Sequence, residues 1–277
     1  MDLDLRKLRY FAALAEHGHF GRAAESLYIA QPVLSRQIRA LEQELGCSLL
    51  TRTTRSVQLT AAGRQLQEEA RSVFATVDAS IRRVHEADRG VARLVVGFAT
   101  GLHVSDAVRA YAAQSPEVQI ALLPLKWWEQ DVPLRDGRAD IGYLRRPFDE
   151  TGLRSVPIGT EPRVACLPVS HPLARRRSLT LAELEGERIL DAHARRTSSA
   201  EEKFELIASG DGIAVVPLSV ARSYLRPDLL HRPVTDAEHV QTCLVVPRGR
   251  RERRVQDFLA VATRTLAPVA TRLAAVD

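Results

Sequence analysis

The pattern of apolar residues changes at Gly90, and this change limits the chain to a fold made of two different parts. Before Gly90, apolar residues return every three or four positions, which is the period of an amphipathic helix. After Gly90, short runs rich in Val, Ile and Leu alternate with helical segments around 104–114, 199–209 and 253–266. Such alternation predicts an α/β fold with largely parallel sheets. The 277 residues therefore divide into a helical N-terminal part and a larger α/β part.

The N-terminal part contains three short helices by its periodicity. The first, over 5–17, carries its apolar residues on one face: Leu8, Phe11, Ala12 and Ala15. Gly18 is a suitable stop for this helix. A second helix is expected over about 22–27, and Pro32 begins the third, where its missing N–H does no harm.

The third helix, "AQPVLSRQIRALEQELG" (30–46), has two different faces. Its apolar stripe consists of Leu34, Ile38, Leu41 and Leu45. The opposite side carries Pro32 and the hydrogen-bonding side chains of Ser35, Arg36, Arg39 and Gln43, with Gln31 at the exposed N-terminal end. Glutamine can pair with adenine and arginine with guanine or phosphate, so this side suits the major groove of DNA. For this helix alone, a solvated amphipathic helix is the alternative.

The segment after the third helix supports the DNA-binding interpretation. "CSLLTRTTRSVQLT" (47–60) predicts two short strands around a polar tip. The tip carries donors suited to the DNA backbone or the minor groove: Arg52, Thr53, Thr54, Arg55 and Ser56. Three short helices followed by a hairpin, with the third helix polar on its outer face, predict a winged helix-turn-helix domain.

A long helix follows, with Thr60 as a natural N-cap. Its apolar residues are spaced almost as in a coiled coil: Leu66, Ala70, Val73, Val77, Ile81 and Val84. We expect a homodimer to form through 60–90, because a long helix with one apolar stripe needs a partner. Packing of the stripe on its own chain is the alternative.

Composition fits a DNA-binding protein of the cytoplasm. The formal net charge is +5, which is compatible with nucleic-acid binding. Lysine occurs only at Lys7, Lys126 and Lys203, so arginine carries nearly all the positive charge. Arginine suits phosphates and guanine edges, but a GC-rich genome is the favoured explanation of this excess. No apolar run is long enough for a membrane span, and no secretory signal is recognisable. We therefore expect no association with a membrane.

The sequence offers little support for an enzyme. It contains no G-x-S-x-G, no P-loop and no full G-x-G-x-x-G, and its eight histidines lack a paired metal-binding spacing. We expect no catalytic site, metal or cofactor. Cys166 and Cys243 both lie in β-rich runs, so they would form a redox pair if their strands were neighbours. The alternative is that all three cysteines, Cys47 included, are small buried residues.

Residues 5–63 resemble the DNA-binding domain of LysR-type transcriptional regulators. The resemblance continues more weakly through "LRDGRADIGYL", "VACLPVSHPLA", "LAELEGE" and "GDGIAVVP". It implies a two-lobed, periplasmic-binding-protein-like effector domain with a small-molecule effector in its cleft. It also implies a homodimer or tetramer that bends promoter DNA, with RNA polymerase as a further candidate partner. The expected domains are 1–59, 60–90 and 91–277, with the second lobe at about 161–246.

The resemblance also assigns candidate site residues. For DNA it implies Gln31, Pro32, Ser35, Arg36, Arg39 and Arg55, to which the wing adds Arg52 and Thr53. For the effector it implies Thr100, Gly101, His103, Lys126, Trp127, Trp128 and Asp191. Backbone N–H groups at the helix start after Thr100 would suit an anionic effector.

The chain departs from the family pattern at four places. Gly21 stands where Ser or Thr often caps the second helix, and Ala30 stands where Ser or Thr often precedes Gln-Pro. The paired tryptophans either stack on a planar effector or fill the cleft. The stretch 191–202 is about two dozen residues shorter than usual, which would remove a helix and a strand and leave a shallow pocket or none. An effector-independent DNA-bending regulator and a thiol-based redox regulator therefore remain alternative functions.

Overall fold

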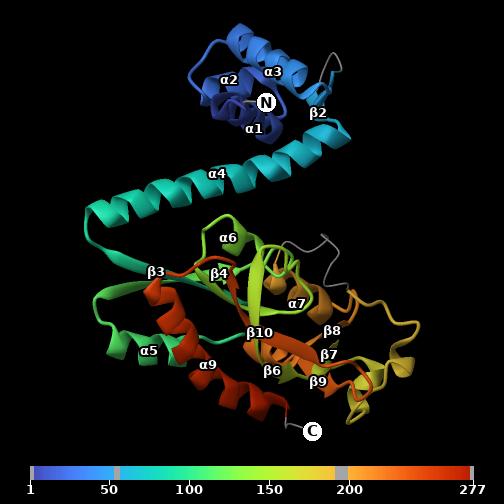
Figure 1. Ribbon diagram of the computed structural model, residues 1–277. Coiled ribbons are helices and arrows are strands. Elements are labelled where there is room, and N and C mark those ends of the chain that lie inside the picture. The colour runs from blue at the N-terminus through green and yellow to red at the C-terminus, as the bar shows by residue number, and fades with distance from the viewer. Residues whose placement is uncertain (1–2, 53–56, 191–198, 275–277) are drawn as a thin grey trace. The chain divides into compact units, whose positions relative to one another are not determined.

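A computed structural model of the chain describes residues 3–52, 57–190 and 199–274 (Figure 1). The contacts within the chain divide it into two compact units, Met1–Ser80 and Ile81–Asp277. The division falls inside the long helix. Within the described residues, no helix has the length and apolar character needed to cross a membrane.

The first unit contains a three-helix domain with a hairpin, followed by the first part of the long helix (Figure 1). Its helices are α1 (Leu5–His17), α2 (Phe20–Ser26) and α3 (Gln31–Leu45), and its antiparallel strands are β1 (Leu50–Arg52) and β2 (Val57–Leu59). Leu34, Ile38 and Leu41 of α3 are fully buried against α1 and α2, in one cluster with Phe11 and Ala23. The predicted helices, hairpin and apolar stripe are confirmed.

The ends of these helices agree with the sequence at most positions. Gly18 and Gly46 adopt left-handed φ values of 61° and 67°, as C-terminal stops do. The second helix begins earlier than predicted, because His19 caps it: its Nδ1 accepts a hydrogen bond from the Gly21 N–H at 3.0 Å. The assignment of Gly21 as the cap is therefore wrong. Ala30 precedes α3 without a side-chain capping bond, as its methyl group requires.

The long helix α4 (Ala61–Asp88) begins at the predicted cap, where Thr60 Oγ1 accepts a hydrogen bond from the Gly63 N–H at 3.0 Å. The last two residues of its apolar stripe are uncovered in the single chain. Ile81 is 51% exposed and Val84 is 67% exposed.

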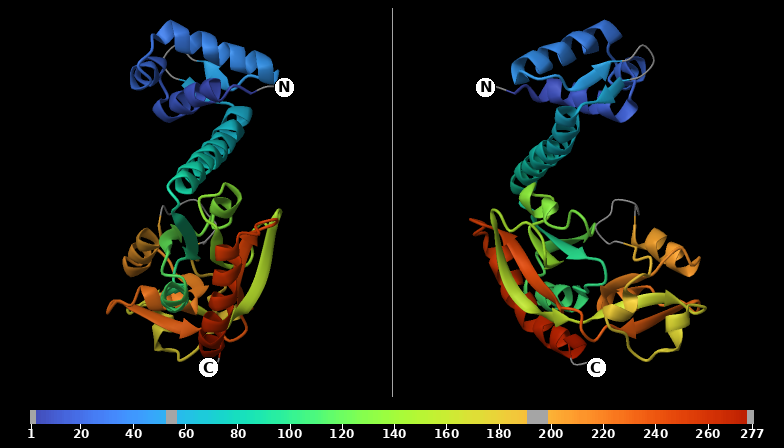
Figure 2. Two further views of the ribbon diagram at one scale, coloured as in Figure 1. Left: turned by 60° about the vertical axis from the view of Figure 1, so that its left-hand side comes forward. Right: turned by 90° about the vertical axis from the view of Figure 1, so that its right-hand side faces the viewer.

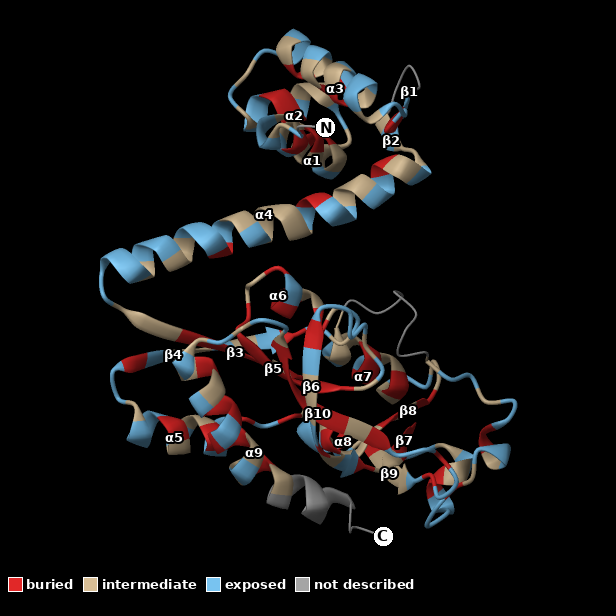
Figure 3. Cartoon of the chain, viewed as in Figure 1, coloured by how far each residue is buried: buried red, intermediate tan, exposed pale blue. Residues whose placement is uncertain are grey.

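The second unit contains a five-stranded sheet with the order β4-β3-β5-β10-β6. Its strands are β3 (Ala92–Ala99), β4 (Val118–Leu125), β5 (Ile141–Arg145), β6 (Leu153–Glu161) and β10 (Val240–Pro247). Helices α5 (Ser105–Gln114) and α9 (Arg253–Ala274) pack together on one face, and Figure 2 shows α9 lying along β6. The short helix α6 (Val132–Arg135) packs on the other face through Leu134. Figure 3 shows the burial of β5 between these layers.

A three-stranded antiparallel sheet, β8-β7-β9, forms the second lobe of this unit. It consists of β7 (Arg163–Pro168), β8 (Ala214–Pro217) and β9 (Leu229–Pro233). Helices α7 (Ala200–Ala208) and α8 (Leu218–Ser223) cover one face, and the short 3₁₀ helices η1 (Pro172–Arg175) and η2 (Ala182–Leu184) belong to the same lobe.

The prediction of largely parallel sheets is wrong. In the larger sheet only the pairs of β3 with β4 and β5 are parallel, and β10 runs antiparallel to β5 and β6. The reason is that β6, β7 and β10 carry the chain between the two sheets, with Pro162 alone linking β6 to β7. Alternation of helices and strands does not reveal which strands make such connections. Because β10 returns to the larger sheet, the strands of the second lobe span 163–233 rather than all of 161–246.

Candidate functional site

The outward face of α3 collects the predicted DNA-contacting side chains. Gln31, Pro32, Arg36 and Arg39 are exposed, and Ser35 is half-buried. Within the described part of the chain, neither Arg36 nor Arg39 forms an ion pair. The side chains on this face are therefore held in place by a buried opposite face, while their donors point away from the domain.

The wing is described only in part. Arg52 is the last residue of β1, which pairs with β2. Thr53 and Arg55 lie outside the described residues, so their predicted contacts with DNA stay predictions.

A cavity of about 140 Å³ lies between the two sheets of the second unit. It is formed by side chains from both lobes: Ala99, Thr100, Trp127, Gln130, Arg145, Arg146, Pro147, Arg163, Ala200, Lys203, Phe204, Val216, Pro217, Val220 and Val240. The walls are mostly apolar, which is typical of a site for a small molecule.

The structure brings two of the predicted effector residues to this cavity, Thr100 and Trp127. Gly101, His103, Lys126 and Trp128 do not line it, and Asp191 lies outside the described residues. Trp127 packs edge-on against Trp128 with ring centroids 5.1 Å apart and forms a wall rather than a plug. Sequence spacing alone could not separate these roles, because neighbouring loop residues point in different directions.

The predicted anion site at the helix start after Thr100 does not belong to the cavity. That helix, α5, begins at Ser105, and none of its residues lines the cavity. His103, in the connecting loop, is exposed.

Four cations line the cavity instead, and sequence reasoning missed all of them: Arg145, Arg146, Arg163 and Lys203. No aspartate or glutamate is among the described residues of the wall. Lys203 is only 5% exposed, and its Nζ lies 4.9 Å from the centroid of the Trp127 ring. The sequence did contain one signal for Lys203: it lies beside Phe204 on the apolar face of the helix predicted at 199–209, where a charged side chain is unusual.

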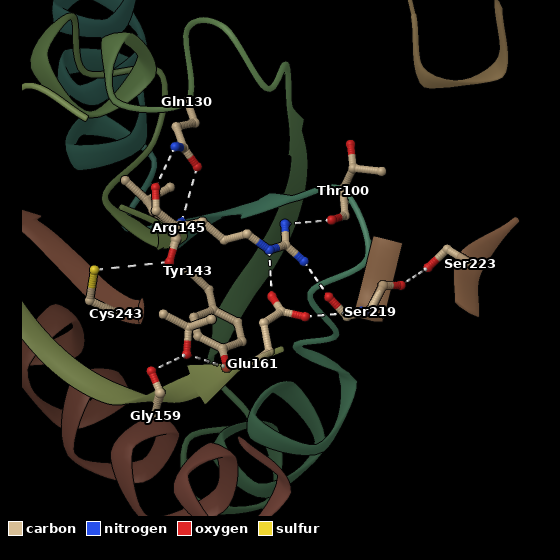
Figure 4. Close-up of polar contacts among 11 residues, drawn as sticks. Thr100, Gln130, Tyr143, Arg145, Gly159, Glu161, Ser219, Ser223 and Cys243 are labelled. Carbon is tan, nitrogen blue, oxygen red and sulfur yellow. Dashed lines mark hydrogen bonds and ion pairs between the residues drawn. The ribbon is translucent and has the colours of Figure 1, made fainter. Parts of the chain in front are cut away.

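Arg145 is the centre of a buried polar network that joins the two lobes (Figure 4). Its Nε donates to Glu161 Oε1 at 2.6 Å and its Nη1 donates to the Thr100 carbonyl at 2.6 Å. Its Nη2 donates to Ser219 Oγ, and the Ser219 N–H donates to Glu161 Oε2 at 2.9 Å. Gln130 bonds both the N–H and the carbonyl of Arg145. The arginine of the first sheet thus holds the start of α8 in the second lobe.

Gly101 has a structural place beside this network rather than in the cavity wall. Its φ is +80°, and a Cβ at this position would lie 2.7 Å from the Ser219 carbonyl carbon and oxygen. Only glycine tolerates both the left-handed backbone and this approach. The close approach of the two lobes at Gly101 explains why this residue is glycine, and no contact with an effector is needed to explain it.

The cysteines do not form the redox pair that was one alternative. Cys166 lies in β7 and Cys243 in β10, and these strands belong to different sheets. Burial raises the pKa of the Cys166 thiol to about 12 and that of Cys243 to about 11, so both stay protonated and unreactive. Cys47 is exposed, contrary to the expectation of burial, because it follows the left-handed Gly46 beyond the end of α3.

We expect the native chain to react with a thiol reagent at one residue. Iodoacetamide at neutral pH should modify Cys47 within minutes and leave Cys166 and Cys243 unmodified until urea is added, because only Cys47 is accessible. Peptide mass spectrometry of the native and the unfolded protein measures this directly. Rapid native labelling of Cys166 or Cys243 would contradict the described burial.

Comparison with known proteins agrees with this architecture in both units. Residues 5–64 match the profile described as "Bacterial regulatory helix-turn-helix protein, lysR family", and residues 85–195 and 192–267 match "LysR substrate binding domain". The uncharacterized HTH-type transcriptional regulator YnfL of Escherichia coli (strain K12) is 34% identical over 284 residues, covering 91% of this chain and 95% of YnfL.

Further relatives and solved structures give the same result. The HTH-type transcriptional regulator CatR of Pseudomonas putida is 32% identical, covering 97% of this chain and 99% of CatR. The crystal structure of CbnR, a LysR family transcriptional regulator, shares the fold with a TM-score of 0.67 at 24% identity, covering 95% of this chain and 99% of CbnR. Full-length BenM has a TM-score of 0.53 at 26% identity, covering 96% of this chain and 98% of BenM. The chain belongs to the LysR family of bacterial transcriptional regulators, which bind DNA and respond to effectors.

Proposed function

We propose that this regulator reads promoter DNA with α3 and that a small anion in the cavity changes this binding. Gln31, Pro32, Ser35, Arg36 and Arg39 would contact the major groove, with Arg52, Thr53 and Arg55 of the wing on the backbone. The observation that carries the DNA half is the division of α3 into a fully buried side and a side of exposed donors. Phosphate contacts would make the affinity fall steeply with salt.

The proposed regulator is a homodimer in the cytoplasm and has no catalytic activity of its own. Exposed Ile81 and Val84 at the end of the α4 stripe support dimerisation through 60–90. A dimer would place two copies of α3 in successive major grooves, about 34 Å apart. The proposal includes two further interactions: two dimers would assemble into a tetramer, and the regulator would contact RNA polymerase. Under it, 1–59 binds DNA, 60–90 dimerises and 91–277 binds the effector.

The chemistry of the cavity supports an effector that is an anion with a flat, apolar body. Lys203 and Arg163 bring positive charge to the cavity, and no aspartate or glutamate is among the described residues of its wall. Arg146 contributes less, because its Nη2 is paired with Glu150 Oε1 at 2.8 Å. Trp127 and Phe204 line the cavity with aromatic rings, and Phe204 stacks on Tyr224 with ring centroids 4.5 Å apart. A carboxylate on an aromatic ring meets both requirements.

Benzoate and neutral benzamide have nearly the same shape, so they test the charge requirement. Benzoate at about one hundred times its Kd should raise Tm by about 5 °C, because it binds only the folded chain. Benzamide should raise it much less. Benzoate should also change the affinity for a duplex that the wild-type chain selects from a random-sequence pool, measured by fluorescence anisotropy. Equal shifts with both compounds would contradict the anionic class.

The variant Val220→Phe provides the matched control for the cavity. Val220 lines the cavity and is half-buried, so a phenyl group would occupy the space without removing a charge. The variant should bind the selected duplex normally and lose both effects of benzoate. Persistence of both effects would place the ligand elsewhere. Intact DNA binding with no response to any aromatic or aliphatic carboxylate would favour the effector-independent regulator.

A further inference from the structure

Tyr28 occupies the turn between α2 and α3 in a conformation that its side chain does not favour. Its φ is +55°, and among the described residues it alone combines a positive φ with a side chain other than glycine's. The residue is 96% exposed. A bulky residue in the left-handed region is uncommon and marks a position for which a functional reason should be sought.

The Tyr28 side chain contributes almost no packing to the folded domain. The turn is closed by two backbone hydrogen bonds of 3.0 Å, from the Tyr28 N–H to the Glu25 carbonyl and from the Ile29 N–H to the Ala24 carbonyl. Any residue with an N–H can form the first of them. Glycine or asparagine would adopt the same φ more easily. A tyrosine at this position therefore costs stability and buries almost no surface in return.

The position of Tyr28 relative to α3 suggests what the ring contacts. In a helix-turn-helix the first helix crosses the DNA backbone and the second enters the major groove, so the turn between them lies at the edge of the groove. Tyr28 stands three residues before Gln31, the first residue of α3. At the start of α3, Ala30 has no polar side chain and Pro32 has no N–H, so Gln31 is the residue there that offers a side-chain donor.

We propose that Tyr28 is a further DNA-contacting residue whose hydroxyl group donates a hydrogen bond to a phosphate oxygen at the edge of the groove. This inference rests on the proposed reading of DNA by α3. A phosphate contact fixes the register of the helix on the duplex and carries no sequence information by itself. The hydroxyl, at the end of a rigid ring, reaches beyond the backbone of the turn with few rotatable bonds to order on binding.

Tyr28→Phe and Tyr28→Asn separate the hydroxyl from the backbone conformation. Affinity would be measured by fluorescence anisotropy on the duplex selected by the wild-type chain and on a duplex of unrelated sequence. Both variants should lose about tenfold in affinity on both duplexes, as expected for a lost hydrogen bond to a charged group. Tyr28→Asn should raise Tm because asparagine tolerates the left-handed φ, whereas Tyr28→Phe should leave Tm unchanged.

A gain in stability together with a loss of affinity is a result that a purely structural role of Tyr28 cannot produce. Wild-type affinity of Tyr28→Phe would overturn the phosphate contact. So would a loss of affinity in Tyr28→Asn accompanied by a lower Tm. Arg36→Ala is measured in parallel. If Arg36→Ala binds DNA as tightly as wild type, the proposal that α3 reads DNA is contradicted. If Arg36→Ala loses affinity and the Tyr28 variants bind as wild type, only the phosphate contact of Tyr28 is contradicted. Tyr10→Phe, which removes the hydroxyl of a half-buried tyrosine of α1 in the same unit, should bind as wild type.

Discussion

Replacing Arg145 with methionine should lower the free energy of unfolding of the second unit by about 3–5 kcal/mol, the usual cost of removing one member of a buried ion pair. Glu161, whose side chain is 1% exposed, would lose its only ion-pair partner among the described residues. The Thr100 carbonyl and Ser219 Oγ would lose a donor at the same time. The attraction between the charges matters less here than the unpaired buried carboxylate that remains.

Urea unfolding followed by near-UV circular dichroism, which reports the tryptophans of the second unit, measures this change. Arg109→Met is the matched control, because Arg109 and its partner Asp106 have side chains that are 74% and 57% exposed. An exposed pair of this kind contributes less than about 1 kcal/mol. The double variant Arg145→Met with Glu161→Leu should recover part of the loss, since no charge stays buried without a partner. Equal stability of Arg145→Met and Arg109→Met would contradict the role of the network.

The DNA-binding face was predictable from the sequence because it depends on one helix. Leu34, Ile38 and Leu41 repeat at helical spacing, so the periodicity alone determines which residues of 31–45 point inward and which point outward. The caps were less predictable. His19 rather than Gly21 caps α2, because an imidazole nitrogen can accept the hydrogen bonds that Ser or Thr usually accepts.

The cavity was much less predictable, because its walls come from distant parts of the chain. Arg145 ends β5, Lys203 lies in α7 and Val240 begins β10, so their proximity depends on how two sheets are connected. The sequence indicated the strands and helices but not that β10 returns to the larger sheet. The pair Arg145 and Arg146 directly after a buried strand was the signal closest to the site, since ligands often bind beyond the carboxyl ends of such strands.

Arg36→Ala should weaken binding to the selected duplex by about one hundredfold while leaving the fold intact. A bidentate contact between arginine and guanine discriminates by about 1–3 kcal/mol, and a dimer would lose two such contacts. Arg36 is exposed and forms no ion pair with another described residue, so its removal leaves no buried group unpaired. Binding to a duplex of unrelated sequence should weaken far less, because phosphate contacts from other residues remain.

Titrations of wild type, Arg36→Ala and Arg109→Ala on the two duplexes at one salt concentration test the central claim, that the exposed face of α3 reads the promoter. Arg109→Ala removes the same charge from α5, which lies outside the first unit. Fluorescence anisotropy should show about a hundredfold loss for Arg36→Ala on the selected duplex, a smaller loss on the unrelated duplex and no change for Arg109→Ala. An unchanged ratio between the two duplexes in Arg36→Ala would contradict the claim.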